Sequence, residues 1–294
     1  MGTVFGWLQT AVDKVREFAY AEPKQALPRR PRVGLALGGG FARGIAHIGV
    51  LRVFRENRIP IDCIAGTSVG ALIASAYAAG VSLEEMEHQA ATTRFRDFGR
   101  WTLSWMGLAT NERLVGYLRR FSAITRFEEL KVPLAIVATD LVSGEPVYFT
   151  RGQLGPALRA SCAYPGLFRP VEYEGRLLVD GFLAAPVPVD AARRLGADVV
   201  IAVFLEAGGF DKPRNFADII GRSFSIVQRY AHSDWKNKAD VVLEPEVKQF
   251  LWDAFEKAPQ LIAAGETAAR AALPTILRAL AGAAPRIAST RPYR

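Results

Sequence analysis

Residues 60–79 read PIDCIAGTSVGALIASAYAA and contain the pattern Gly-x-Ser-x-Gly around Ser68. The apolar run before the pattern predicts a buried strand over 60–65, and the run after it predicts a buried helix over 69–79. A serine on a sharp turn between a strand and a helix is typical of a nucleophile elbow. Gly66 and Gly70 suit such a turn because larger residues would crowd it. A tight turn in which Ser68 only caps the helix has the same pattern.

Neighbouring segments repeat this alternation of strands and helices. Further strands are predicted over 33–37, 132–139 and 198–204, and further helices over 44–56 and 257–280, where Pro274 is a potential break. Alternating elements of this kind predict an α/β fold, with a mostly parallel central sheet flanked by helices on both faces. Ligands of such sheets bind at the carboxyl ends of the strands, which is where the serine motif falls.

Three regions are expected along the chain. Residues 1–31 predict an N-terminal amphipathic helix and a linker, residues 32–283 one α/β domain ending in C-terminal helices, and residues 284–294 a basic tail. Charged residues interrupt the apolar positions of the first region, so it does not resemble a secretory signal and we expect a cytoplasmic protein. The uncharged run 63–83 is long enough for a membrane span, but its glycines favour a strand, a turn and a helix.

A run of three glycines, Gly38, Gly39 and Gly40, follows the predicted strand 33–37 and precedes a helix. Consecutive glycines allow backbone N–H groups to converge on an anion, and beside a nucleophile they would form an oxyanion hole. A dinucleotide-binding loop fits poorly because Arg43 stands where its third glycine is required. Arg43 is expected either to brace the loop or to meet a phosphate.

The base that would activate Ser68 is less obvious from the residues. His47 is expected to be a packing residue, whereas His232 stands late enough to complete a Ser-Asp-His order, although no turn motif supports it. Asp180 precedes Gly181 at the end of a short predicted strand, 176–180, and a turn there can aim a carboxylate into a site. A desolvated carboxylate can take the serine proton directly. An ordinary hairpin with an Asp-Gly turn is the alternative.

Four segments in this order make the chain resemble the patatin-like phospholipase family, particularly its small bacterial members. Residues 37–51 resemble the oxyanion segment of the family, 66–70 its nucleophile elbow, 160–171 the segment before its aspartate, and Asp180-Gly181 its catalytic pair. The resemblance covers residues 32–280. It implies a fold related to the α/β-hydrolases and a lipid-like acyl ester, such as a phospholipid, as substrate.

The resemblance also implies the roles of the site residues. Ser68 and Asp180 would form a catalytic dyad without histidine, working through an acyl-enzyme and using no metal or cofactor. The oxyanion would be held at Gly38, Gly39 and Gly40, with support from Arg43, Gly66, Gly70 and Gly181. The chain departs from the family at Phe41 and Phe182, where small residues are usual. These departures leave open a catalytically weak module that binds lipid or has a regulatory role.

The formal charge of +8 favours anionic partners. Residues 94–126 combine seven arginines with several aromatic residues, and this composition is typical of a surface that contacts an anionic membrane. A helical insertion with a solvated basic face would have the same composition. No zinc-ligand spacing or long basic block indicates a nucleic-acid module, so nucleic acid is not an expected partner. The composition does not indicate an oligomeric state.

Overall fold

The computed structural model describes residues 30–282, apart from 103, 121, 207, 209–211, 213–218, 225 and 227–233. The predicted N-terminal helix, His232 and the basic tail 284–294 lie outside the described residues. Expectations that rest on them therefore stay predictions.

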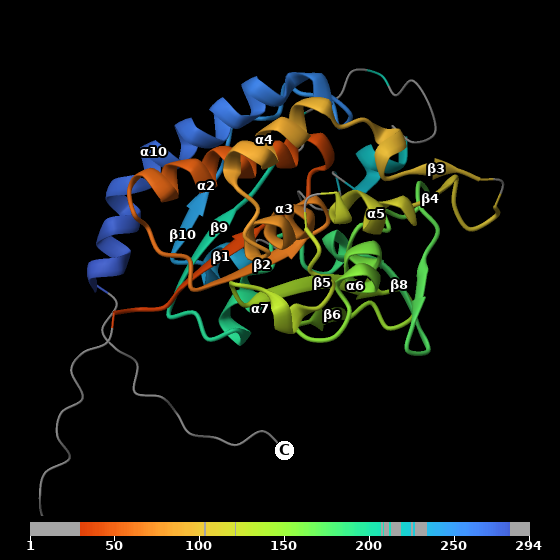
Figure 1. Ribbon diagram of the computed structural model, residues 1–294, viewed down its shortest axis with the longest axis horizontal. Coiled ribbons are helices and arrows are strands. Elements are labelled where there is room, and N and C mark those ends of the chain that lie inside the picture. Colours follow the sequence, from red (N-terminus) through yellow and green to blue (C-terminus); the bar gives the residue numbers. More distant parts are fainter. Residues whose placement is uncertain are drawn as a thin grey trace, which may run out of the picture. The chain divides into compact units, whose positions relative to one another are not determined.

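An eight-stranded sheet forms the centre of the described part of the chain (Figure 1). Its order is β10-β9-β1-β2-β5-β8-β7, with β6 also paired to β5. The first five strands of this order are parallel, whereas β6, β7 and β8 run antiparallel to their neighbours. The strands are β1 (Val33–Leu37), β2 (Cys63–Thr67), β5 (Leu134–Asp140), β6 (Pro146–Phe149), β7 (Val171–Tyr173), β8 (Arg176–Asp180), β9 (Val199–Val203) and β10 (Val241–Leu243).

Helices cover both faces of this sheet, so the predicted fold class is confirmed. One face packs against α2 (Ala46–Glu56), α3 (Val69–Ala78), α4 (Leu83–Thr92), α6 (Leu154–Ser161) and α10 (Ala258–Gly282). The other face packs against α7 (Val189–Arg194) and α9 (Asp234–Lys238). Short 3-10 helices occur at Phe41–Ile45, Phe95–Asp97, Phe127–Glu129, Gly181–Leu183 and Phe255–Lys257.

Side-chain size differs between the two faces. Leu35 and Leu37 of β1 fill the larger core, whereas Ala36 points toward the α7 side. A Cβ at Gly34 would lie 2.6 Å from the Cβ of Ala197. The small residues therefore let the α7 layer approach closely, because interiors are packed without spare space.

Helix α10 packs lengthwise along α2 (Figure 1). A Cβ at Gly49 would lie 2.0 Å from the carbonyl oxygen of Ile262, and one at Gly265 would lie 1.9 Å from that of Ala46. Two glycines thus bring the helix backbones together. Pro274 lies inside α10 and does not end it, so the potential break does not occur.

Residues 94–126 do not form a helical insertion. They contain a two-stranded antiparallel hairpin, β3 (Arg100–Trp101) with β4 (Ala109–Thr110), and then the short helix α5 (Arg113–Arg119). The hairpin projects from the body of the molecule at the right of Figure 1. Among the helices that the structure describes, none is long and apolar enough to cross a bilayer.

Candidate active site

Ser68 lies at the sharp turn between β2 and α3, as its motif predicts. Its backbone has φ 56° and ψ −126°, which is a strained conformation for a residue with a side chain. A Cβ at Gly66 would lie 2.4 Å from the Cα of Ala71, and one at Gly70 would lie 2.2 Å from the carbonyl oxygen of Leu37. Only glycine fits at either position, so the two glycines make the turn possible.

Asp180 reaches Ser68 because β8 runs antiparallel to β5. In this register Asp180 lies opposite Ala138 of β5. The residue before Ala138 in β5 pairs with Thr67 of β2, which directly precedes Ser68. The strand therefore ends at the level of the serine. The hydroxyl of Ser68 donates a hydrogen bond of 2.7 Å to Asp180 Oδ2, and the N–H of Phe182 donates one of 2.9 Å to Oδ1.

Gly181 allows the chain to turn away directly after the carboxylate. A Cβ at this position would lie 2.2 Å from the carbonyl oxygen of Val137 and 3.2 Å from Thr67 Cγ2. Any side chain would push the backbone away from β5 and move Asp180 from the serine. The requirement for glycine here is therefore one of space rather than of backbone dihedral angle.

Burial gives the Asp180 carboxylate its chemical character. The residue is 1% exposed, and desolvation raises its pKa from 3.8 to about 7, against the opposing effect of the hydrogen bonds from Ser68 and Phe182. A carboxylate with this pKa is a much stronger base than an exposed one. Its direct contact with the serine hydroxyl can therefore draw the proton from Ser68.

The glycine loop lies beside the serine, and two of its backbone N–H groups have acceptors within the protein. The N–H of Gly38 donates to the carbonyl of Val203 at 3.0 Å, and that of Gly39 donates to the carbonyl of Pro186 at 3.2 Å. These two bonds hold the loop on β9 and on the segment before α7, and the oxyanion hole expected at Gly38, Gly39 and Gly40 stays a prediction. Among the described residues, no group accepts a hydrogen bond from the N–H of Gly40 or Phe41.

Arg43 braces the glycine loop. Its backbone N–H and its Nε both donate to the carbonyl of Gly40, at 3.2 and 3.3 Å. Its side chain is buried, and desolvation lowers its pKa to about 10. Of the two expected roles, the structure shows the bracing contact.

Two positioning residues were missed by the sequence reasoning. His47 donates from Nε2 to the carbonyl of Gly38 at 2.8 Å, and burial lowers its pKa to about 4, so the ring is neutral. Ser161 accepts from the N–H of Ser68 at 2.9 Å and donates to the carbonyl of Val137 at 2.6 Å. His47 was expected to be a packing residue, and only its place just after the glycine loop hinted at this contact.

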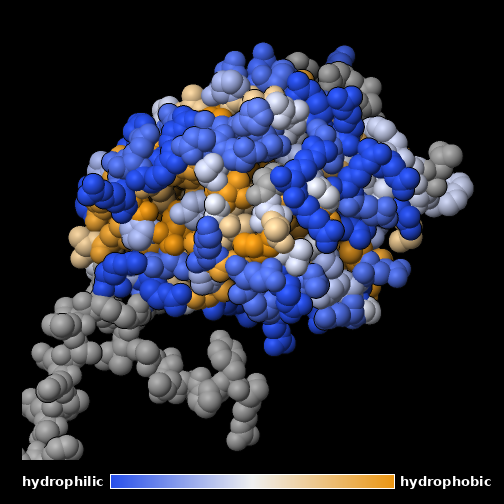
Figure 2. Space-filling model, in the orientation of Figure 1, coloured by the Kyte–Doolittle hydropathy of each residue, from blue (hydrophilic) through white to orange (hydrophobic). Residues whose placement is uncertain are grey.

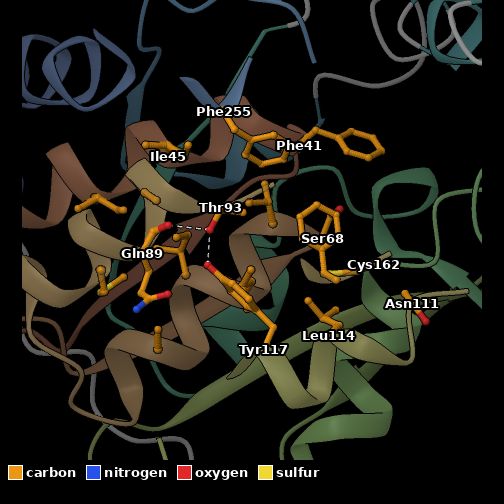
Figure 3. A pocket seen from close by; sticks show the side chains of 18 of the residues that line it. Phe41, Ile45, Ser68, Gln89, Thr93, Asn111, Leu114, Tyr117, Cys162 and Phe255 are labelled. Carbon is orange, nitrogen blue, oxygen red and sulfur yellow. Dashed lines mark hydrogen bonds between the residues drawn. The ribbon is translucent and has the colours of Figure 1, made fainter. Parts of the chain in front are cut away.

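An apolar cavity opens from Ser68 into the layer between α3, α4 and α5 (Figure 3). The labelled side chains of Figure 3 show Ser68 on one side of it and Gln89, Thr93 and Tyr117 on the other. In the orientation of Figure 1, the molecular surface shows an apolar region framed by polar side chains (Figure 2). Such an enclosure suits an apolar ligand.

The two departures from the family pattern lie at the serine. The ring of Phe182 lies beside Gly39, where a Cβ would be 3.4 Å from Phe182 Cδ2 and 3.3 Å from Ser68 Cβ. Phe41 has φ 51°, lines the cavity, and contacts the rings of Tyr164 and Trp252 edge to face, with centroids 5.0 and 5.3 Å apart. Both phenylalanines narrow the space around the hydroxyl without displacing it from Asp180.

No cluster of three or more side chains suited to hold a metal ion occurs within the described ranges. A family model for patatin-like phospholipase matches residues 35–193, which include the glycine loop, Ser68 and Asp180. The chain belongs to the patatin-like phospholipase family.

The relatives that match this chain are longer proteins. An uncharacterized NTE family protein of Mycobacterium tuberculosis is 42% identical over 184 residues, which cover 60% of this chain and 51% of that protein. A lysophospholipase of Aspergillus fumigatus is 30% identical over 204 residues, covering 67% of this chain and 13% of that protein. The chain thus spans about half the length of the mycobacterial relative and a small part of the fungal one.

Among solved structures, VipD from Legionella pneumophila superposes on the chain with a TM-score of 0.49 and 14% sequence identity, over 86% of this chain and 67% of that one.

Ser161→Ala should lower the reactivity of Ser68 by roughly tenfold or more. The change leaves the N–H of Ser68 and the carbonyl of Val137 without their partner, and a buried unsatisfied group costs about 1–3 kcal/mol. The rate of labelling by a fluorophosphonate measures this effect, with urea unfolding as the measure of stability. Ser75→Ala is the matched control, because Ser75 is another buried serine that donates to a helix carbonyl. Equal labelling rates for Ser161→Ala and wild type would contradict the role.

Asp180→Asn should make the protein more stable above about pH 7. The folded state holds the Asp180 proton up to about pH 7, whereas the unfolded chain releases it near its ordinary pKa of 3.8, so the free energy of unfolding falls as pH rises between these values. Asparagine does not ionise, and the gain is up to about 4 kcal/mol.

Urea unfolding across this pH window measures the difference between Asp180→Asn and wild type. Asp190→Asn, which removes an exposed carboxylate paired with Lys238, should keep the wild-type pH dependence. An Asp180→Asn variant with that same dependence would show that burial does not perturb the carboxylate.

Proposed function

We propose that the protein is a serine-dependent lipid acyl hydrolase in which Ser68 is the nucleophile and Asp180 its general base. The observation that carries this proposal is the 2.7 Å hydrogen bond from the Ser68 hydroxyl to a buried carboxylate beside an apolar cavity. Membership of the patatin-like phospholipase family agrees with it. Because the matched relatives are longer proteins, the activity of the whole protein is part of the proposal.

The reaction proceeds in two halves. Ser68 Oγ attacks the ester carbonyl carbon while its proton passes to Asp180 Oδ2, and the tetrahedral intermediate then expels the alcohol, which takes that proton. The product is an acyl-enzyme on Ser68. Asp180 next accepts a proton from water, the resulting hydroxide attacks the acyl carbon, and the released Ser68 oxygen recovers the proton as the acid leaves.

The oxyanion of each intermediate is held by backbone N–H groups. The N–H groups of Gly40 and Phe41 are the candidates, because the N–H groups of Gly38 and Gly39 donate to other backbone carbonyls of the protein. Removing one donor of this kind typically costs about 3–4 kcal/mol of transition-state stabilisation. The N-terminus of α3 begins directly after Ser68, and its dipole adds a field that favours the negative charge.

A serine-histidine mechanism has less support. His47 is neutral, buried and bonded to the glycine loop, and His88 lies on the exposed side of α4. His232, the candidate from the sequence, lies outside the described residues. The direct contact of Ser68 with Asp180 leaves no space for an imidazole between them. These contacts favour the dyad over an esterase that uses His232.

The substrate class follows from the cavity beside the serine. Its walls are mainly aliphatic and aromatic, and this lining favours an acyl chain over a polar substituent. A relative that is 30% identical over 204 residues is a lysophospholipase. We therefore assign a phospholipid, a lysophospholipid or a related acyl ester as the substrate.

The hairpin of β3 and β4 is the candidate for contact with an anionic membrane. Trp101, Trp105, Met106 and Leu108 are exposed on it, and Trp105 is fully so. The base of the hairpin lies on the segment that lines the cavity, since the N–H of Ala109 donates to the carbonyl of Leu167 and Ala109 pairs with Phe168. Exposed tryptophans among arginines favour the interfacial zone of a bilayer.

Covalent labelling tests the dyad. A fluorophosphonate should add once to wild type and not to Ser68→Ala. Folded Asp180→Asn should be labelled at least about a hundredfold more slowly, because a general base typically raises the reaction rate by about 10²–10⁴-fold. The wild-type rate should rise with pH through about 7, because Asp180 must lose its proton to act as a base. Well-folded wild type that resists labelling while binding lipid vesicles would favour the non-catalytic module.

Vesicle binding tests the hairpin. The double variant Trp105→Ser with Leu108→Ser should bind vesicles containing phosphatidylserine at least about tenfold more weakly, because each large apolar side chain contributes about 1.5–3 kcal/mol when fully buried. Wild-type binding should weaken with added salt. Leu277→Ser, which changes an exposed leucine on α10, should bind as wild type. Equal wild-type binding to neutral and anionic vesicles would contradict the electrostatic part of this contact.

A further inference from the structure

A second pocket lies beside α5 and is lined mainly by basic side chains. Four of its residues are spaced so that they share one face of α5 and its C-cap, and these are Arg113, Gly116, Tyr117 and Arg120. The short 3-10 helix Phe95–Asp97 completes the pocket with Arg96 and Asp97. The pocket therefore contains three arginines and one carboxylate.

The carboxylate of Asp97 is already shared between two donors. Its Oδ2 accepts a hydrogen bond from the N–H of Arg94 at 2.8 Å, and its Oδ1 accepts one from Arg120 Nη1 at 3.3 Å. Arg113 Nη1 donates to the carbonyl of Arg96 at 3.1 Å, which is an uncharged acceptor. Within the described ranges, no group accepts a hydrogen bond from the guanidinium of Arg96. The described residues therefore leave an excess of positive charge in the pocket, and such an excess attracts an anion.

Gly116 leaves open space at the centre of the basic face. It lies in the middle of α5, and a Cβ at this position would meet no atom within 4 Å. Neither a close contact nor a left-handed backbone therefore requires glycine here, and glycine weakens the interior of a helix relative to alanine. A ligand that needs the space between the arginines would account for this glycine.

A phosphate group matches this arrangement. Guanidinium groups bind phosphate oxygens through pairs of hydrogen bonds, and a phosphomonoester presents three such oxygens and nearly two negative charges at neutral pH. The bonds of Arg113 and Arg120 to the 3-10 helix hold both side chains beside the pocket, so less side-chain freedom is lost on binding.

The pocket adjoins both the hairpin and the catalytic cavity. The hairpin of β3 and β4, which exposes two tryptophans, lies in the chain between Asp97 and Arg113. Tyr117 also lines the catalytic cavity, on the side opposite Ser68 (Figure 3). The wall of that cavity thus separates the pocket from the reacting ester, so the pocket suits a second molecule rather than the ester under attack.

We propose that Arg96, Arg113 and Arg120 form a binding site for a phosphomonoester, over the open space at Gly116. Two sources present this group: the headgroup of a lipid such as phosphatidic acid, and a soluble phosphate ester. The site needs no catalytic activity. It differs from a general attraction to anionic bilayers because it requires particular side chains at fixed positions.

Vesicle sedimentation tests the lipid source. Phosphatidylcholine vesicles carry either phosphatidic acid or phosphatidylserine at equal total charge. Wild type should bind the phosphatidic acid vesicles at least about tenfold more tightly, because phosphatidylserine lacks the third free phosphate oxygen and a hydrogen bond between charged groups changes affinity by about this factor. The ratio of the two affinities is the readout, so the contribution of the hairpin to both vesicles cancels.

Two kinds of variant should abolish this ratio. Gly116→Leu fills the space without changing the charge, and it should fold because leucine favours a helix more than glycine does. The double variant Arg96→Gln with Arg113→Gln removes two of the binding groups. Arg100→Gln with Arg119→Gln is the matched control, since it removes two exposed arginines that do not line the pocket and should weaken binding to both vesicles alike. An unchanged ratio in both folded pocket variants would overturn the lipid site.

Titration calorimetry with glycerol 3-phosphate at fixed ionic strength tests the soluble source. Binding to wild type should be at least about tenfold tighter than binding to Gly116→Leu. A preference for phosphatidic acid without calorimetric binding would assign the site to a lipid headgroup, and calorimetric binding without that preference would assign it to a soluble ester. Absence of both in folded wild type would overturn the site, whatever the outcome of fluorophosphonate labelling at Ser68.

Discussion

A carboxylate held in an apolar interior against a serine hydroxyl is the interaction on which the site depends. Asp180 loses its hydration in the folded protein, and among the described residues the Ser68 hydroxyl and the N–H of Phe182 are the donors that compensate for this loss. The ionised state is therefore disfavoured, and the pKa rises. The same desolvation that makes the carboxylate a base reduces the stability of the fold, so the rest of the structure must hold both residues in place.

Backbone contacts supply that support. The N–H of Ser68 is fixed by Ser161, and the hydroxyl of Thr139 donates to the carbonyl of Asp180 at 2.9 Å. On the other side of the serine, His47 and Arg43 both donate to carbonyls of the glycine loop. Each of these side chains bonds to main chain, so the loop and the elbow are held by the layers beneath them rather than by solvent-exposed contacts.

The glycine loop shows how tertiary contacts distinguish residues that look equivalent in the sequence. Gly38, Gly39 and Gly40 look alike as a pattern, yet the first two are tied to Val203 and Pro186, which come from β9 and from the segment before α7. Pairing with these neighbours gives the N–H groups of the first two glycines acceptors within the protein. Within the described part of the chain, the N–H groups without an acceptor lie at Gly40 and at Phe41, whose backbone is in the left-handed region.

Local residue patterns were sufficient to predict the α/β class, the strand and helix around Ser68, and the glycines of the elbow, because buried periodicity and tight turns depend on neighbours in the chain. A local motif and a family resemblance also predicted Asp180 as the partner of Ser68. Its distance from Ser68 depends on the antiparallel register of β8 with β5, which joins residues 112 apart in the chain. Other features were decided only by the tertiary structure, since each depends on packing between elements far apart in the sequence. These features are the contacts of His47 and Ser161, the hairpin within 94–126 and the depth of the cavity.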